Sequence, residues 1–137
     1  MGFLGNSAPY EADLNLVAQI FVLGLLFIGA SLAKASEFKL HARIMISAIA
    51  IQFGAVFLWM VPPLIRNLGA LGSGGTGTAI TLLHVYFGTY ALALTIAAVV
   101  HWKEIQLKWT MRAAFSAWLL VAILGIAFYA HYYLGIL

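Results

Sequence analysis

Residues 78–100, TAITLLHVYFGTYALALTIAAVV, form an apolar run that contains no Asp, Glu, Lys or Arg. A helix needs roughly 20 predominantly apolar residues to cross the ~30 Å hydrocarbon core of a bilayer, and this run is long enough. Three further runs of similar length extend from Leu14 to Ala33, from Ile44 to Ile65 and from Arg112 to Leu137. The sequence therefore predicts four membrane-spanning helices.

The composition of the whole chain agrees with this interpretation. Of its 137 residues 64% are hydrophobic and 8% are charged, and the mean hydropathy is +1.03, values outside the range of a soluble domain. An open sheet would leave unpaired strand edges in lipid, whereas helices satisfy their own backbone groups. We therefore expect one all-α domain over residues 1–137, a four-helix up-and-down transmembrane bundle in the cell membrane.

The distribution of basic residues predicts the orientation of this bundle. Arg66 is the basic residue of the second connection, and the other six flank the first and third connections: Lys34, Lys39, Arg43, Lys103, Lys108 and Arg112. Cytoplasmic loops carry an excess of Lys and Arg, so both termini are predicted to be extracytoplasmic. The net charge of +3 comes from these loops and is not interpreted as nucleic-acid binding. Pro62 and Pro63 are expected to stop the second helix just before the glycine-rich second connection.

The residue types that are missing restrict the chemistry. The chain contains no cysteine, which excludes disulfides, thiolate metal sites and iron–sulfur clusters. The predicted spans contain no Asp or Glu, which argues against a proton pump or an ion-coupled transporter. The sequence favours a protein without independent enzymatic activity. Histidine must therefore carry any haem or metal chemistry.

Four histidines lie in or beside the predicted spans. His84 follows Thr78 by six residues and His131 precedes Leu137 by six, so each is expected roughly 9 Å from the outer end of its helix. Two imidazoles at one level on adjacent helices could be the paired axial ligands of haem b, or part of a copper or iron site. Alternatively, each imidazole donates a hydrogen bond to a neighbouring carbonyl and binds nothing.

Helical spacing places each of these two histidines on a stripe of mostly small residues. The first stripe consists of His84, Gly88, Ala91, Thr95 and Ala98, and the second of Ala113, Ala117, Leu120, Leu124, Ala127 and His131. Such a face can accommodate a flat macrocycle, but it is equally typical of a tight contact between two helices.

The second helix carries a further polar face. This face consists of His41, Met45, Ala48, Gln52, Ala55 and Trp59, and it is expected to point into the bundle. Gln52 could orient a histidine or a quinone carbonyl, or form an interhelical hydrogen bond. His41 and His101 lie at the predicted cytoplasmic boundary, either as interfacial histidines or as ligands of a second haem.

From the second predicted helix onwards, the chain resembles the small four-helix membrane proteins of the YozB/CtaM type, which are associated with cytochrome oxidase maturation. The resemblance is carried by residues 40–45 (LHARIM), residues 82–85 (LLHV), His101, and Trp118 followed by residues 124–129 (LGIAFY). It implies that His41, His84 and His101 are metal- or haem-related. The chain differs from the family near the end of the second helix, where the family has another histidine. Four histidines at two depths are also similar to the di-haem cytochromes of the b561 type.

These features predict a respiratory-chain membrane protein with a histidine-based haem or metal site, acting in electron transfer or in cytochrome oxidase maturation. The candidate ligands are His84, His131, His41 and His101, and haem b is the candidate cofactor. The alternative is an accessory subunit without its own cofactor, packed in a larger membrane complex such as an oxidase or a monooxygenase. The expected partners are the lipid bilayer and other membrane subunits.

Overall fold

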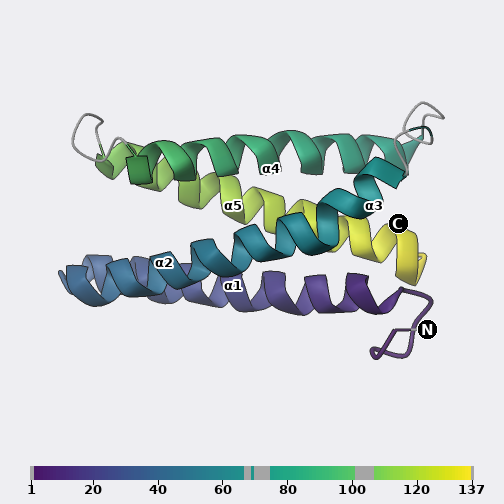
Figure 1. Ribbon diagram of the computed structural model, residues 1–137, viewed down its shortest axis with the longest axis horizontal. Coiled ribbons are helices and arrows are strands. Elements are labelled where there is room, and N and C mark those ends of the chain that lie inside the picture. The colour runs from purple at the N-terminus through teal and green to yellow at the C-terminus, as the bar shows by residue number, and fades with distance from the viewer. Residues whose placement is uncertain (1, 67–68, 70–74, 101–106, 137) are drawn as a thin grey trace. The chain divides into compact units, whose positions relative to one another are not determined.

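The computed structural model describes residues 2–66, 69, 75–100 and 107–136, and its long regular elements in these ranges are helices (Figure 1). In chain order the elements are α1 (Tyr10–Lys34), α2 (Phe38–Ala55), the π-helical turn η1 (Val56–Met60), α3 (Val61–Arg66), α4 (Thr76–Val100), α5 (Leu107–Tyr129) and the π-helical turn η3 (Ala130–Leu134).

Four helical stretches among the described residues are long and apolar enough to cross a membrane. They are Tyr10–Lys34, Phe38–Arg66, Gly77–Val100 and Lys108–Leu134. At a rise of about 1.5 Å per residue, the shortest of them, with 24 residues, is about 36 Å long and exceeds the hydrocarbon thickness of about 30 Å. The predicted all-α class and the four spans are confirmed, and the chain is a multi-pass membrane protein.

The second span begins at Phe38, six residues before the predicted start at Ile44. The first connection is therefore a tight turn and not a longer loop. Ser36 adopts the left-handed conformation with φ +63°, and the Glu37 N–H donates to the Leu32 carbonyl oxygen at 2.9 Å. This hydrogen bond closes the end of α1 in the manner of a Schellman motif. Lys39 and Arg43 are therefore part of α2, and their long side chains can still extend from the helix end to the headgroup region.

Pro62 and Pro63 do not stop the second helix, which continues to Arg66. Both prolines lie in the first turn of α3, directly after the π-helical turn η1. Proline lacks a backbone N–H and is tolerated in the first turn of a helix, where that N–H has no intrahelical partner. The change to π-helical hydrogen bonding before the prolines thus lets the helical path continue.

The last span starts at Lys108 and ends at Leu134, whereas the sequence predicted Arg112 to Leu137. Gly135 has φ +63°, and the Ile136 N–H donates to the Ala130 carbonyl oxygen at 3.3 Å. A left-handed glycine is a common helix terminator because it carries no Cβ. The helix therefore ends before the carboxyl terminus.

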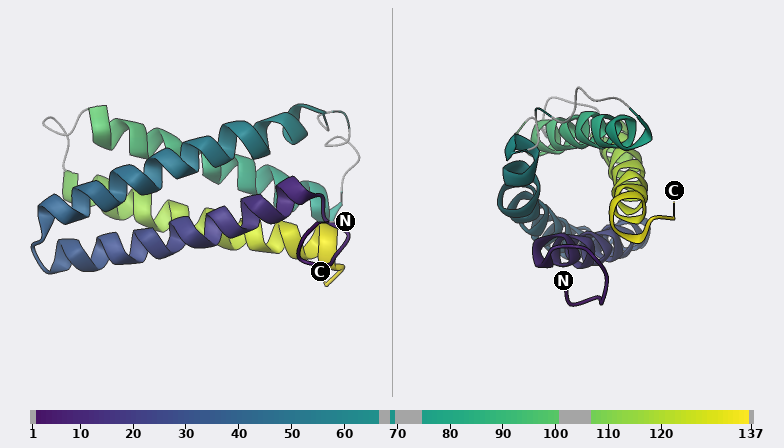
Figure 2. Two further views of the ribbon diagram at one scale, coloured as in Figure 1. Left: turned by 60° about the horizontal axis from the view of Figure 1, so that its bottom comes forward. Right: turned by 90° about the vertical axis from the view of Figure 1, so that its right-hand side faces the viewer.

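The chain divides into two compact units, residues 1–70 and residues 71–137. In the first unit α1 packs antiparallel to α2, and in the second unit α4 packs antiparallel to α5 (Figure 2). Small side chains line both contacts, as is usual where helix backbones approach closely in lipid. The buried residues of the second unit include Ala91, Thr95, Ala98, Ala114, Ala117, Trp118 and Val121.

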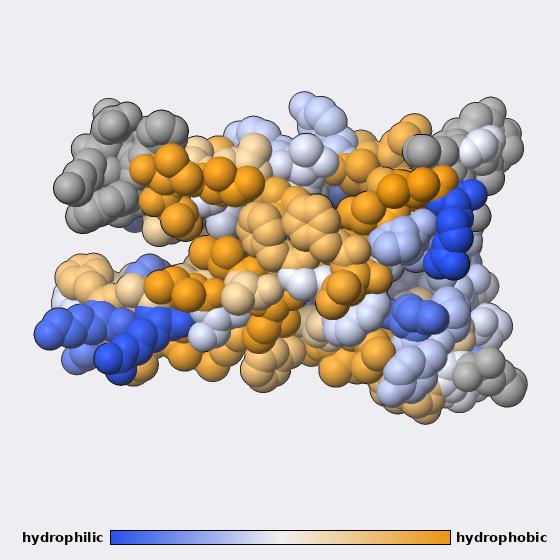
Figure 3. Space-filling view, in the orientation of Figure 1, coloured by the Kyte–Doolittle hydropathy of each residue, from blue (hydrophilic) through white to orange (hydrophobic). Residues whose placement is uncertain are grey.

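Large apolar side chains cover much of the surface. Phe21, Leu58 and Ile123 are all more than half exposed, which would be unfavourable in water but is expected in contact with lipid tails. In Figure 3 apolar residues cover the middle of α2, and hydrophilic residues gather where α2 begins. The helix ends therefore match the polar boundaries of a bilayer.

Candidate functional site

His84 lies in the contact between α4 and α5. A Cβ atom added to Gly125 would be 3.1 Å from His84 Cε1, so the imidazole rests against the backbone of α5. The centroid of the Phe128 ring is 6.5 Å from that of the imidazole, and the Val121 backbone lies close to the imidazole. Nδ1 of His84 is buried, and no described residue forms a hydrogen bond with it. The site is thus an imidazole enclosed by a glycine, an aromatic ring and a backbone segment.

The α4 side of this contact agrees with the predicted stripe. Ala91, Thr95 and Ala98 are buried, and a Cβ on Gly88 would be 4.0 Å from Val121 Cγ1. The predicted face of α5 is right at Ala117, which is buried, and wrong at two other positions. Ala113 and Leu120 are exposed, and Ala114, Trp118 and Val121 are buried in their place. Helix α5 is thus rotated relative to the prediction.

His131 lies at the other end of the contact, beside the start of α4. A Cβ on Gly77 would be 2.9 Å from His131 Nε2 and 2.6 Å from Tyr132 Oη. The rings of His131 and Tyr132 pack edge to face with centroids 5.1 Å apart. Gly77 precedes His84 by seven residues, which is about 10 Å along the helix. The structure therefore does not bring His84 and His131 together, and the expectation of equal depth is wrong.

The predicted depth of His131 is wrong because the ends of the helices were predicted incorrectly. Equal depth was counted from Thr78 and Leu137, but the last helix ends at Leu134 and contains the π-helical turn η3. His84 is instead level with Gly125. A shift of about six residues in the pairing of two helices moves an expected partner by more than one turn.

His41 lies in the contact between α1 and α2. Its Nδ1 is 2.8 Å from the Gly29 carbonyl oxygen, and Met45 Sδ would be 2.6 Å from a Cβ on Gly29. On the same predicted face Ala48, Gln52 and Ala55 are buried, which confirms that this face points inward. Within the described residues, no partner forms a hydrogen bond with Gln52 Oε1. His101 lies outside the described residues.

Three buried polar side chains were not identified as site residues from the sequence. The Trp118 indole N–H donates to Thr95 Oγ1 at 3.0 Å, and the Thr95 hydroxyl donates to the Ala91 carbonyl oxygen at 2.8 Å. Asp13 is fully buried in the first turn of α1 and accepts a hydrogen bond of 2.9 Å from the Leu4 N–H. Acidic residues just after a proline are a helix-start signal that could have placed Asp13 in the helix.

The described residues test whether a metal or a haem would fit. In residues 2–66, 75–100 and 107–136, no group of three or more His, Asp or Glu side chains is placed to hold a metal ion. Haem iron needs only one or two axial ligands from the protein. His84 alone could supply one such ligand, with the Val121 backbone beside it to orient the ring.

The chain matches none of the protein-family models with which it was compared, and it matches no curated protein and no solved structure. The resemblance to the YozB/CtaM type is therefore carried by the quoted residues alone and stays a prediction.

Proposed function

We propose that the protein is a respiratory-chain membrane protein that holds a b-type haem through His84, in electron transfer or in cytochrome oxidase maturation. The observation that carries this proposal is the buried Nδ1 of His84, for which the described part of the chain supplies no hydrogen bond. Buried polar atoms in proteins are nearly always paired, and ionisable groups within membrane spans are by default functional.

The surroundings of His84 suit an axial ligand. A metal-bound imidazole usually donates its other N–H to a carboxylate or a backbone carbonyl, which fixes the ring orientation. The Val121 backbone is beside the imidazole and could take this role. Gly125 leaves room for the ring against α5, and Phe128 would shield one side from water. A bound haem would supply one-electron chemistry, which none of these side chains performs.

His131 is not the second ligand, because it lies beside Gly77, about 10 Å from His84 along the axis of α4. His41 and His101 are metal- or haem-related only by the family resemblance, and they would belong to a separate site and not to the haem at His84. The expected partners, namely lipid and other respiratory subunits, are part of the same proposal.

A haem titration of the purified protein tests the proposal. Wild type is expected to develop a Soret band with one haem bound per chain. His84→Ala is expected to lose this band, whereas His131→Ala is the matched control and should keep it. Both variants should still insert, because insertion depends on hydrophobicity summed over whole helices. A Soret band that is unchanged in His84→Ala would disprove the assignment.

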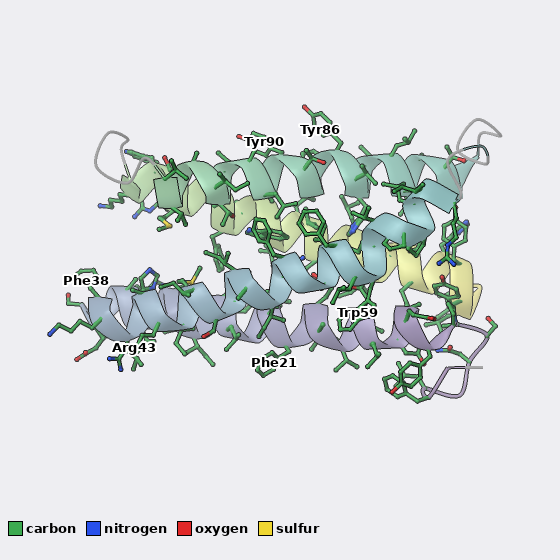
Figure 4. The ribbon with its side chains drawn as sticks, in the orientation of Figure 1. Phe21, Phe38, Arg43, Trp59, Tyr86 and Tyr90 are labelled. Atoms are coloured by element: carbon green, nitrogen blue, oxygen red, sulfur yellow. The ribbon has the colours of Figure 1, made fainter. Side chains whose placement is uncertain are left out.

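A second candidate function is an accessory subunit of a larger membrane complex, and a specific feature of α4 favours it. Tyr86 and Tyr90 are 68% and 50% exposed, and in Figure 4 both side chains point away from the neighbouring α5. They lie near the middle of the span Gly77–Val100. Tyrosine is usually found at the membrane interfaces. The side chains of Tyr86 and Tyr90 lie too far from either interface for their hydroxyl groups to reach it.

A phenolic hydroxyl in hydrocarbon is costly unless it is hydrogen-bonded. A transmembrane helix of a partner subunit with a polar side chain could supply that bond. Tyr86→Phe combined with Tyr90→Phe should then reduce co-purification of the partner complex, whereas Tyr10→Phe, at an exposed position near the start of α1, should not. Equal yields of the complex from both variants would exclude this role for α4.

A further inference from the structure

We propose that His41 and Met45 form a binding site for a Cu(I) ion in the unit of residues 1–70. This inference is independent of the proposed haem function, which rests on His84 in the other unit. It starts from the contact that both side chains make with Gly29 of α1.

The hydrogen bond of His41 shows that one particular ring nitrogen carries a proton. The Gly29 carbonyl oxygen, 2.8 Å from Nδ1, can only accept a hydrogen bond, so Nδ1 must carry the proton. In a neutral imidazole the other nitrogen, Nε2, then has a free lone pair. Metal-binding histidines usually have this arrangement, with one nitrogen donating to a backbone carbonyl and the other binding the metal.

Met45 brings a second donor to the same place. It follows His41 by four residues in α2, so the two side chains share one helix face. A Cβ on Gly29 would be 2.6 Å from Met45 Sδ and 3.7 Å from His41 Nδ1. The thioether sulfur and the imidazole are therefore neighbours, and the lack of a side chain at Gly29 makes room for both.

The donor types select the ion. Neutral imidazole and thioether are ligands for soft metals, whereas Mg²⁺ and Ca²⁺ require several oxygen ligands. Cu(I) accepts two-coordinate geometry, whereas Zn²⁺ in proteins is almost always four-coordinate. Lys39 and Arg43 are exposed, and each is two residues from His41, about 200° around the helix. Their charges therefore do not face the site. Glu37 lies one turn before His41 and is the acidic residue on the helix face that carries His41 and Met45.

Competition with bicinchoninate under reducing conditions measures the affinity of the purified protein for Cu(I). Wild type is expected to bind one Cu(I) per chain. Met45→Leu conserves volume and removes the sulfur. His41→Asn keeps an amide N–H that can donate to the Gly29 carbonyl, but removes Nε2. Each variant should lower the affinity at least roughly tenfold, the smallest effect expected even for residues that only orient a ligand.

Met111→Leu is the matched control, because Met111 lies in α5 of the other unit. It should bind Cu(I) as wild type does, and the chain has no cysteine that could add background binding. X-ray absorption at the copper edge should show a sulfur ligand in wild type and none in Met45→Leu. The proposal is overturned if wild type does not compete for Cu(I), if Met45→Leu binds as tightly as wild type, or if Zn²⁺ displaces the copper.

Discussion

Each histidine in the described part of the chain lies against a glycine of the neighbouring helix. His41 contacts Gly29, His84 contacts Gly125, and the Gly77 contact includes His131. An imidazole is bulky and polar, and a glycine lets it approach the backbone of the opposite helix. The sequence showed which residues were histidines and glycines, but not which pairs meet, because pairing depends on the axial offset of two helices.

Gly29→Ala should destabilise the contact between α1 and α2 by about 1–3 kcal/mol, the usual cost of overpacking. The new Cβ would be 2.6 Å from Met45 Sδ, so Met45 would have to move. Gly24→Ala in the same helix is the control, because nothing lies within 4 Å of its Cβ position. Equilibrium unfolding in mixed detergent micelles measures both variants, and equal stability of the two would contradict this account of Gly29.

At the scale of the helices, the four spans were predictable, whereas their exact ends and the rotation of α5 were not. A helix that is apolar on all sides gives little contrast between its inward and lipid-facing sides. In the sequence, the face that contains Ala113 and Leu120 therefore could not be distinguished by its polarity from the buried face that contains Ala114 and Trp118. On α4 the prediction was right because Thr95 and His84 mark the inward face.

The hydrogen bond between Trp118 and Thr95 should contribute to the contact between α4 and α5. Both residues are buried, and interhelical hydrogen bonds in membranes contribute about 0.6 kcal/mol on average and up to about 1.7 kcal/mol. A double-mutant cycle with Trp118→Phe and Thr95→Val should give a coupling energy in that range. Trp109→Phe, at a position 63% exposed, paired with Thr95→Val should give none. A coupling near zero in the first cycle would mean that the bond is not formed.

Engineered cysteines can determine the axial offset of α4 and α5, because the native chain has none. A Cβ on Gly88 would be 4.0 Å from Val121 Cγ1, so side chains at these two positions are in contact, as a disulfide between them requires. Gly88→Cys with Val121→Cys should therefore form a disulfide on oxidation, measured as loss of maleimide labelling. Gly88→Cys with Ala127→Cys represents the offset predicted from equal depth and should stay reduced. The opposite result would restore the pairing of His84 with His131.

At the scale of the whole molecule, the composition was sufficient to predict a multi-pass, all-helical membrane protein, and the four spans agree. The hydrocarbon thickness sets a length that apolar runs reveal directly. The candidate ligands could be named from the sequence because so few ionisable residues lie in the spans. Their contacts depend on helix rotation and offset, which hydropathy does not encode.

The orientation of the chain is a prediction of the positive-inside rule. Six of the seven basic residues flank the first and third connections, so a reporter fused to the carboxyl terminus should be extracytoplasmic. An alkaline phosphatase fusion should be active there and a green fluorescent protein fusion dark. The reverse pattern would place both termini in the cytoplasm.

The central claim, a haem held at His84, is tested most directly by the absorption spectrum of the protein purified from membranes that contain haem b. The account predicts a Soret band in the oxidised protein and a sharp α band after reduction with dithionite. A colourless protein that co-purifies with a larger membrane complex would contradict the claim and favour the accessory subunit.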